Sequence, residues 1–230
     1  MDWISFYDFK HSVIYVNERH RDVHYRKIAE DIRGYVPPHS ANVLDYGCGE
    51  ANSADLVAEA ASHLTLVEAA PNVRASLTAC YAGNPKISVM TPDEAAAREP
   101  GSFDLIVMHS VAQYLTAAEL DKQLAVFHRL VKPDGLVVVG DVVPPSFAAP
   151  AAALSLLRCG AANGFFWAAV GGLIRILLSD YFQLKKTHGL SHYTEAAMLE
   201  RLKAGGFSAK RGERNIGHNQ WRMTFLARKA

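Results

Sequence analysis

The 230-residue sequence predicts an α/β fold, a doubly wound and mostly parallel sheet with helices on its faces. From residue 41 onward, short apolar runs closed by Gly, Pro, Asp or Asn alternate with stretches long enough for a helix, which is typical of such sheets. The first run ends in a glycine turn that leads into one of these stretches. The chain is long enough for one sizeable core, so we expect a single domain over residues 1–230.

The individual elements follow in chain order. Residues 1–40 mix aromatic and charged positions and end at Pro37-Pro38, which predicts one or two helices. The apolar runs predict seven strands, at residues 42–46, 64–68, 87–90, 103–109, 136–140, about 208–214 and about 221–228. The stretches between them predict helices at about 52–61, 71–81, 116–131 and 194–204.

Start and stop signals support the last two helices. Thr116 followed by Glu119 forms a capping-box pair, which would satisfy two backbone amides at the start of the helix over 116–131. The residues 132–135, Lys-Pro-Asp-Gly, predict a turn into the next strand. Thr194 is a typical N-cap, and a glycine pair at 205–206 ends its helix.

Composition narrows the class of partner and the compartment. The formal net charge is +1 and no basic stripe is present, so a nucleic-acid partner is not expected and a small molecule is favoured. Cys48, Cys80 and Cys159 fit neither a disulfide framework nor a zinc site and suit a reducing compartment. No signal peptide is visible, so we expect a cytoplasmic protein.

The glycine turn is the first candidate for chemistry. Gly47 and Gly49 let the backbone bend sharply and approach a ligand, and Glu68 ends the next strand, where an acid can bind both hydroxyls of a ribose. The dinucleotide pattern G-x-G-x-x-G is incomplete, because Asn52 holds the place of its third glycine. Taken alone, the turn fits a plain strand-to-helix connection equally well.

Four motifs occur in order: VLDYGCGEA, LVEAAP, SFDLIVMHSVAQYL and LVKPDGLVVVGD. Together they resemble the class I S-adenosylmethionine-dependent methyltransferases, closely over residues 41–141. The resemblance implies a seven-stranded sheet with an antiparallel last strand. It also implies an N-terminal helical lid (1–40), a cofactor-binding core (41–141), an apolar helical insert after the fifth strand (142–192) and a C-terminal helix with a β-hairpin (193–230).

The resemblance also implies which residues bind S-adenosylmethionine and its product S-adenosylhomocysteine. Those expected at the methionine part are Asp45, Gly47, Gly49 and His109. Glu68 would bind the ribose, Ala69 would lie against the adenine, and Thr91 and Pro92 occupy the place of the contact with the adenine amino group. In similar enzymes the N-terminal helix covers the cofactor, so Tyr15 and Arg19 are expected at its carboxylate. An ordinary amphipathic helix is the alternative for that segment.

Further candidates lie on loops that the family topology places at the carboxyl ends of the strands. A general base is expected among His109, Asp141 and His218. The expected substrate contacts are His24, Tyr25, Tyr114, Phe166, Tyr193 and His218. Asp141 can equally cap the following turn, and His218 can sit in a plain hairpin. His20 and His24, four residues apart, share a helix face but lack a third ligand, so no metal is expected.

The stretch 144–181 is strongly apolar, yet four glycines and two arginines argue against a membrane span. Two helices are expected there, lining an apolar substrate site, a homodimer seam or a membrane interface, or packing on the domain's own core. We expect methyl transfer by in-line displacement to the oxygen or nitrogen of a small, largely apolar molecule. The alternatives are a lipid-like substrate at the membrane surface, a non-catalytic cofactor-binding module and a nicotinamide dehydrogenase.

Overall fold

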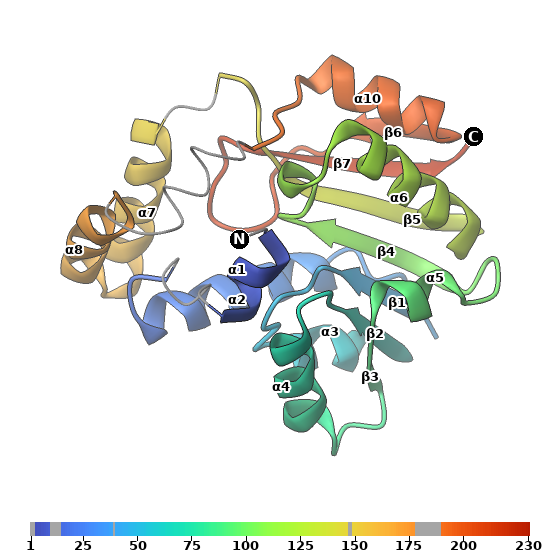
Figure 1. The fold of residues 1–230 in the computed structure, drawn as a ribbon, viewed down its shortest axis with the longest axis horizontal. Coiled ribbons are helices and arrows are strands. Elements are labelled where there is room, and N and C mark those ends of the chain that lie inside the picture. Colours follow the sequence, from blue (N-terminus) through green and yellow to red (C-terminus); the bar gives the residue numbers. More distant parts are fainter. Residues whose placement is uncertain (1–2, 10–14, 39, 147–148, 178–189) are drawn as a thin grey trace.

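A computed structural model describes residues 3–9, 15–38, 40–146, 149–177 and 190–230. Its centre is a seven-stranded sheet in the order β3-β2-β1-β4-β5-β7-β6 (Figure 1). All neighbouring strands pair in parallel except β7, which is antiparallel to both β5 and β6. The predicted α/β class, the seven strands and the antiparallel last strand are therefore confirmed.

Most strand bounds match the apolar runs. The strands on one side of the sheet centre are β1 (Asn42–Tyr46), β2 (His63–Val67) and β3 (Ile87–Met90), and those on the other side are β4 (Phe103–His109), β5 (Val131–Val142), β7 (Met223–Lys229) and β6 (Phe207–Arg211). β1, β3 and β4 have the predicted bounds. The first glycine turn and the ends of β4 and β5 thus lie together at the carboxyl edge of the sheet.

The beginning of β5 differs from the prediction. The strand starts at Val131, because Phe103 already pairs with Val131, whereas the next paired residues are Leu105 and Leu136. The residues 132–135 therefore bulge out of the ladder inside the strand instead of forming a turn before it. Lys132 is held there by the carboxylate of Asp104, with Nζ–oxygen distances of 2.8 and 2.9 Å.

Two apolar layers cover the sheet, because successive strand residues point to opposite faces. Val43, Leu105 and Val138 face α2 (Glu18–Arg33), α3 (Ala54–Ala60) and α4 (Pro71–Tyr81). Leu44, Ile106 and Val139 face α5 (Pro92–Ala96), α6 (Ala117–Leu130) and α10 (Glu195–Ala204). The Thr116–Glu119 capping box and the Thr194 cap are both present. α5 and the short 3₁₀ helix η2 (Ala112–Tyr114) were not predicted.

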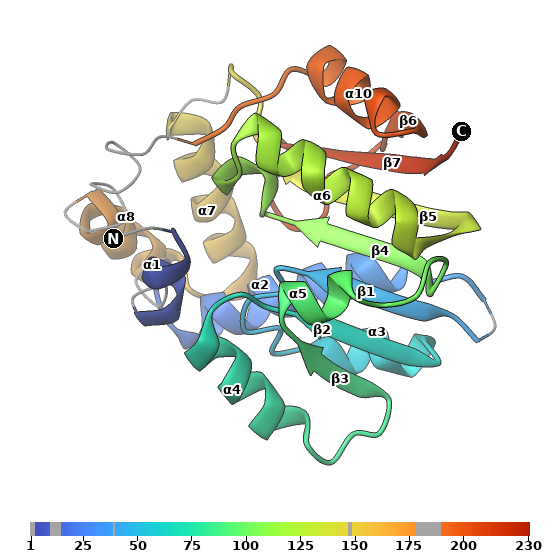
Figure 2. The ribbon, with the colours of Figure 1, turned by 45° about the vertical axis from the view of Figure 1, so that its right-hand side comes forward.

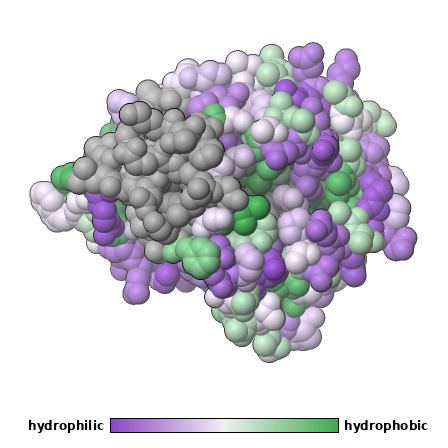
Figure 3. Space-filling model, viewed as in Figure 1, coloured by the Kyte–Doolittle hydropathy of each residue, from purple (hydrophilic) through white to green (hydrophobic). Residues whose placement is uncertain are grey.

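The remaining helices gather beyond the carboxyl ends of the central strands, as both ribbon views show (Figure 1, Figure 2). They are α1 (Trp3–Phe9) and the two helices of the apolar stretch, α7 (Ala149–Asn163) and α8 (Phe166–Leu177). The first turn of α2 reaches α7, because Arg19 donates to the carbonyl of Asn163. No helix among the described residues is long and apolar enough to span a membrane. On the face drawn in Figure 3, hydrophilic and apolar side chains are interspersed outside the grey area.

Candidate active site

The glycine loop between β1 and α3 holds a conformation that only small residues allow. Gly47 and Gly49 have φ angles of +69° and +60°. A Cβ added at Gly47 would lie 2.4 Å from Cγ2 of Val111, and one added at Gly49 would lie 2.9 Å from the hydroxyl of Tyr25. The backbone is therefore closely approached by the segment after β4 and by helix α2, which makes a narrow cradle.

Glu68 closes this cradle from the end of β2. Its two carboxylate oxygens accept hydrogen bonds of 2.9 Å from the backbone amides of Gly49 and Ala70. Asp45, at the end of β1, lies in the same environment, and its burial together with the charge of Glu68 raises its pKa to about 7. Asp45, Glu68 and the glycine turn thus lie together, and the half-buried Ala69 directly follows Glu68.

Helix α2 covers the loop with its aromatic residues. The hydroxyl of Tyr25 accepts a hydrogen bond from the amide of Glu50 at 3.1 Å and one from the hydroxyl of Tyr15 at 2.9 Å. Burial raises the pKa of Tyr15 well above its usual range, so it stays a neutral donor. Tyr25, and through it Tyr15, is therefore brought to the glycine loop.

Thr91 and Pro92 begin α5 at the end of β3. Thr91 is the N-cap, and its hydroxyl accepts a hydrogen bond of 3.1 Å from the amide of Glu94, whose carboxylate accepts one of 2.7 Å from the amide of Thr91. The side chain of Thr91 is thus engaged within its own helix. The Thr-x-x-Glu spacing at 91–94 was visible in the sequence and would have predicted α5.

Helix α1 is held by contacts with the start of α4 and with η2. The carboxylate of Asp8 accepts hydrogen bonds from the backbone amide of Asn72 at 2.6 Å and from its side-chain amide at 3.0 Å, at the start of α4. Tyr7 and Tyr114 are joined through their hydroxyls at 2.7 Å, and Trp3 stacks against Tyr114 with ring centroids 4.5 Å apart. Tyr114 therefore belongs to an aromatic wall made with α1.

His109 ends β4 at the centre of the carboxyl edge. Its side chain is buried, and its Nδ1 has no hydrogen-bond partner among the described residues. Burial lowers the pKa of His109, although the carboxylate of Asp141 works in the opposite direction. The imidazole is consequently neutral at pH 7 and able to take up a proton.

Asp141 is buried at the end of β5, and both of its carboxylate oxygens have polar partners. Its carboxylate pairs with Arg222 and accepts hydrogen bonds from the hydroxyl of Ser110 and, at 3.2 Å, from the side-chain amide of Asn215. Burial alone would raise the pKa of Asp141, but Arg222, His109, Ser110 and Asn215 together hold it below the ordinary value. Asp141 therefore joins β4, β5 and the turn before β7 and is poorly suited to accept a proton.

His24 and His218 meet in a cluster with His20, at ring-centroid distances of 5.9 to 6.2 Å. Burial, with smaller contributions from neighbouring histidines, lowers the pKa of His24 to about 3 and that of His20 to about 4. Within the described part of the chain, no group of three His, Cys, Asp or Glu is arranged to hold a metal ion. These imidazoles are neutral and lie between α2 and the turn from β6 to β7.

Three candidates lie away from the glycine loop. Arg19 donates through Nε to the carbonyl of Asn163, at the junction of α7 and α8. Phe166 is exposed at the start of α8, against Trp167. Tyr193 is buried in the core beneath Arg201, whose guanidinium carbon is 5.6 Å from the ring centroid. The structure thus gives each of these side chains a local packing partner, and their contact with a ligand stays a prediction.

Several residues of the site were missed from the sequence. Ser110, Asn215 and Arg222 bind Asp141, and Gln113 accepts a hydrogen bond from Arg222; these residues come from two segments, one after β4 and one between β6 and β7. Ser110 and Asp141 also have φ angles of +58° and +63°, which no sequence motif announces. The Asp8 contact joins positions 64 residues apart. Only long-range pairing could have revealed these contacts.

Comparison with known proteins adds the family. A family model described as a methyltransferase domain matches residues 44–139, which hold β1 to β5 up to Val139. No curated protein matches the chain. Many solved structures share the fold.

Three of these structures illustrate the likeness. A Haloferax volcanii methyltransferase in complex with the Trm112 activator is 10% identical, with a TM-score of 0.64 over 100% of this chain and 98% of that one. Streptomyces venezuelae DesVI is 16% identical, with a TM-score of 0.61 over 91% and 94%. A Burkholderia thailandensis 1,6-didemethyltoxoflavin-N1-methyltransferase, bound to 1,6-didemethyltoxoflavin and S-adenosylhomocysteine, is 16% identical, with a TM-score of 0.57 over 90% and 78%. At these identities the structures establish a common fold.

Proposed function

The chain carries a class I S-adenosylmethionine-dependent methyltransferase domain over residues 44–139, and from that premise we propose that it methylates the oxygen or nitrogen of a small, largely apolar molecule. The observation that carries this proposal is the position of His109. Its neutral, buried imidazole ends β4, next to the strand whose glycine loop forms the cofactor cradle.

The residues present fit the cofactor. The backbone at Gly47 and Gly49 leaves no room for a Cβ, and Glu68 places a carboxylate beside the loop for the ribose hydroxyls. Asp45, Gly47, Gly49 and His109 would hold the methionine part. We assign Ala69, Thr91 and Pro92 to the adenine and Tyr15 to the carboxylate, as the family pattern implies. Arg19 would have to leave Asn163 to reach the same group.

S-adenosylmethionine supplies a methyl group on positively charged sulfur, which the acceptor's lone pair displaces to leave S-adenosylhomocysteine. The protein's residues have to align the acceptor, exclude water and, for a hydroxyl acceptor, remove its proton. We assign the proton to an imidazole nitrogen of His109, with His218 as the second candidate. Asp141, paired with Arg222, positions the turn that carries His218 through Asn215.

The acceptor pocket is proposed to involve His24, Tyr25, Tyr114, Tyr193 and His218. Tyr114 contributes through the wall that it makes with α1, and the two histidines through their cluster. Phe166 would join them only if the acceptor extends along α8. The three free cysteines fit a reducing compartment, which supports a cytoplasmic location.

Labelled S-adenosylmethionine tests the proposal directly. Incubation of the protein with cell extracts should label a small molecule, and transfer to protein or RNA alone would contradict this version. The variant His109→Gln should lower kcat about 100-fold or more while calorimetry still detects S-adenosylhomocysteine binding, because general-base catalysis contributes about that much. His192→Gln, at an exposed position, is the matched control.

A lipid-like acceptor at a membrane surface is the second candidate, and the surface of α8 favours it. Trp167 and Ile174 are 81% and 61% exposed, and residues 142–179 carry only Arg158 and Arg175 as charges. Aromatic and positively charged groups suit the interface of an anionic membrane. In this version the wild-type protein should float with anionic vesicles and the variant Trp167→Glu should not. A homodimer through the same surface would appear instead as a doubled mass without vesicles.

A further inference from the structure

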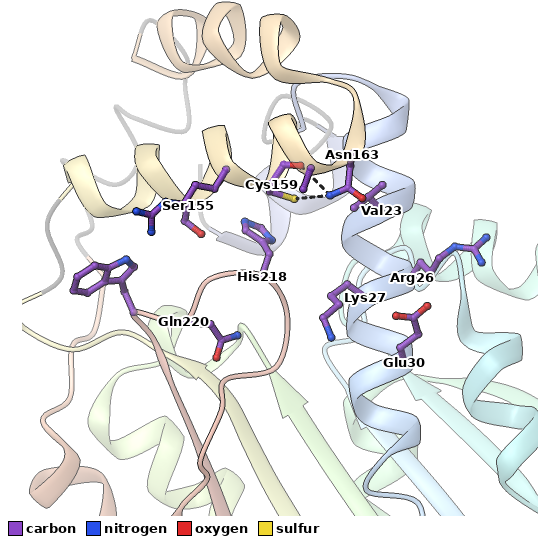
Figure 4. Close-up of a pocket in the computed structure, with 12 residues that line it drawn as sticks. Val23, Arg26, Lys27, Glu30, Ser155, Cys159, Asn163, His218 and Gln220 are labelled. Carbon is purple, nitrogen blue, oxygen red and sulfur yellow. Dashed lines mark hydrogen bonds between the residues drawn. The ribbon is translucent and has the colours of Figure 1, made fainter.

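A cavity of about 550 Å³ lies between α2, α7 and the turn from β6 to β7. Pockets of this size ordinarily bind small molecules. One wall is a face of α2, the second a face of α7, and the third the turn itself, as Figure 4 shows. The residues that line these walls include Val23 and Lys27 from α2, Ser155 and Arg158 from α7, and His218 and Trp221 from the turn.

Positive charge predominates in the lining. Arg26, Lys27 and Arg158 face a single acidic lining residue, Glu30. Lys27 reaches from α2 toward the turn in Figure 4, whereas Arg26 extends away from it. Lys27 pairs with Asp31, which stands outside the lining and also accepts the amide of Gly217 at 2.8 Å. Arg158 is exposed and has no ion pair within the described part of the chain.

The uncharged part of the lining is half apolar (Val23, Cys159, Ala162 and Trp221) and half polar (Ser155, Asn163, His218 and Gln220). Val23 on α2 and Ala162 on α7 contribute aliphatic groups from opposite walls, and the indole of Trp221 stands in the turn. Trp221 is 56% exposed, so part of its ring is accessible to a molecule in the cavity. The cavity thus offers an apolar surface bordered by two cations on separate helices.

The turn from β6 to β7 links the cavity to the candidate active site. His218 lines the cavity, and its ring is 5.9 Å from that of His24. The preceding residue, Gly217, is so close to β4 that a Cβ added to it would lie 4.0 Å from Cε1 of His109. Gly217 and His218 therefore lie between the cavity and the imidazole that we assign as the base.

We propose that this cavity binds a small amphipathic acid, its carboxylate or phosphate held between Lys27 and Arg158 and its apolar body against Val23, Ala162 and Trp221. This inference rests on the proposed function and deepens it, because the acid is then the methyl acceptor. Two cations that approach from different helices fix the distance between the anionic end and the reacting atom. That separation would select the length of the acceptor.

A pair of fluorescent probes tests the charge requirement. The anion 8-anilinonaphthalene-1-sulfonate should bind, whereas the neutral N-phenyl-1-naphthylamine should bind much more weakly. Lys27→Met and Arg158→Met should each weaken binding of the anion by up to about fivefold, the usual effect of an exposed ion pair, and high salt should weaken it too. Arg33→Met removes a cation from the same helix outside the cavity and should change nothing.

Cysteine alkylation locates the bound probe. Cys159 lines the cavity, whereas Cys80 is exposed on α4 and serves as an internal control in the same chain. The anionic probe should slow alkylation of Cys159 by iodoacetamide and leave Cys80 unchanged, as measured by mass spectrometry. Protection should disappear in the double variant of Lys27 and Arg158. Both residues are exposed enough for the variants to fold, which a thermal melt checks.

The outcomes separate this proposal from the methyltransferase function. Equal binding of the neutral probe, or no protection of Cys159, would overturn the assignment of the cavity. Methylation confined to neutral acceptors would overturn it as well, while the proposed function stands. Charge-dependent binding with protection of Cys159, but no methyl transfer to any carboxylate or phosphate in a compound library, would leave an anion site and contradict the acceptor role.

Discussion

Glu68 joins the glycine loop to the sheet more directly than any other side chain described above. Its oxygens bind the amides of Gly49 and Ala70 and also lie where the ribose hydroxyls are expected. Replacement by Gln removes the charge and one acceptor. We expect Glu68→Gln to weaken S-adenosylhomocysteine binding about tenfold or more, because hydrogen bonds to charged groups are worth about 1.5–3 kcal/mol.

Calorimetric titration measures this change. Glu59→Gln is the matched control, since Glu59 is exposed on α3 and pairs only loosely with Arg33 at 3.7 Å. Unchanged affinity for S-adenosylhomocysteine in Glu68→Gln would show that the carboxylate of Glu68 does not bind the cofactor. A loss of thermal stability without loss of affinity would mean that Glu68 only supports the loop.

If Asp45 binds the cofactor as proposed, we expect cofactor binding to depend on pH. Burial and the charge of Glu68 raise its pKa to about 7, so Asp45 takes up a proton in the free protein as the pH falls through neutrality. A positively charged cofactor favours the carboxylate, so binding should release a proton. Affinity for S-adenosylmethionine should fall as the pH drops below 7, approaching about tenfold per unit. Titrations between pH 8 and 5.5 measure it, and Asp45→Asn should flatten the profile.

For individual residues, the spacing of motifs along the sequence predicted part of the candidate site and missed the rest. The glycines and Glu68 follow their strands directly, so the sequence placed them at the sheet edge. Arg19 was expected at the cofactor, yet in the described structure its guanidinium satisfies the carbonyl of Asn163, 144 residues away. Asp141 was identified, but not Arg222, whose pairing with it makes a base of Asp141 unfavourable.

Among the elements, α4 is unusual because its N-terminus is capped from another helix. Its own N-cap, Ala70, has no side chain that can accept a hydrogen bond, and the carboxylate of Asp8 on α1 binds the amide of Asn72 instead. We expect Asp8→Ala to cost about 1 kcal/mol in the free energy of unfolding, as the loss of a cap does. It should also release α1 from the edge of the sheet.

Urea denaturation gives the stability, and limited proteolysis reports on α1. Cleavage between α1 and α2 should become faster in Asp8→Ala than in the wild type. Asp22→Ala is the control, since Asp22 is 66% exposed and lies 3.9 Å from Arg21. Equal cleavage rates in all three proteins would show that Asp8 does not hold the helix.

Element bounds were predictable wherever apolar runs were short and closed by turn residues. β1, β3 and β4 are of this kind. β5 was predicted too short because its first half, Val131 to Gly135, contains Pro133 and a bulge that hides the strand pattern. α5 was missed because it has only five residues. The two helices of the insert were predicted, but their outer contacts depend on tertiary packing.

For the whole molecule, the buried histidines set the response to acid. Burial lowers the pKa of four imidazoles below the ordinary value, so each binds a proton less readily in the folded than in the unfolded protein. They are those of His20, His24, His109 and His218. Their contribution to stability is complete above pH 6.5 and is lost as the pH falls toward 4. Asp45, whose pKa is raised, stabilises the folded state increasingly over the same interval, but the loss of stability from four imidazoles is larger than the gain from one carboxyl group.

The melting temperature should therefore fall steadily from pH 7 to pH 4.5. His24→Gln should make this decline shallower, because it removes the imidazole with the lowest pKa, about 3. His192→Gln, at an exposed position, should leave the slope unchanged. A melting temperature that is constant over this range would mean that the cluster around His218 is accessible to water in solution.

The antiparallel final strand was implied by the resemblance that the four motifs carry, whereas the order of the strands in the sheet was not predicted. The packing of α2 against the turn from β6 to β7 did not follow from them. It depends on Asp31 binding the amide of Gly217, a contact across 186 residues. The cavity beside that contact was accordingly invisible to sequence analysis.

Gly140, near the end of β5, has an evolutionary consequence. A Cβ at this position would lie 2.9 Å from Nδ1 of His109 and 3.2 Å from Cδ1 of Ile216. The imidazole of His109 on β4 thus fits in its position because Gly140, opposite it on β5, has no side chain. Among natural relatives, positions 109 and 140 should change together, so that a larger residue at 140 accompanies a smaller one at 109. Such relatives should remove the acceptor's proton with a group other than an imidazole at position 109.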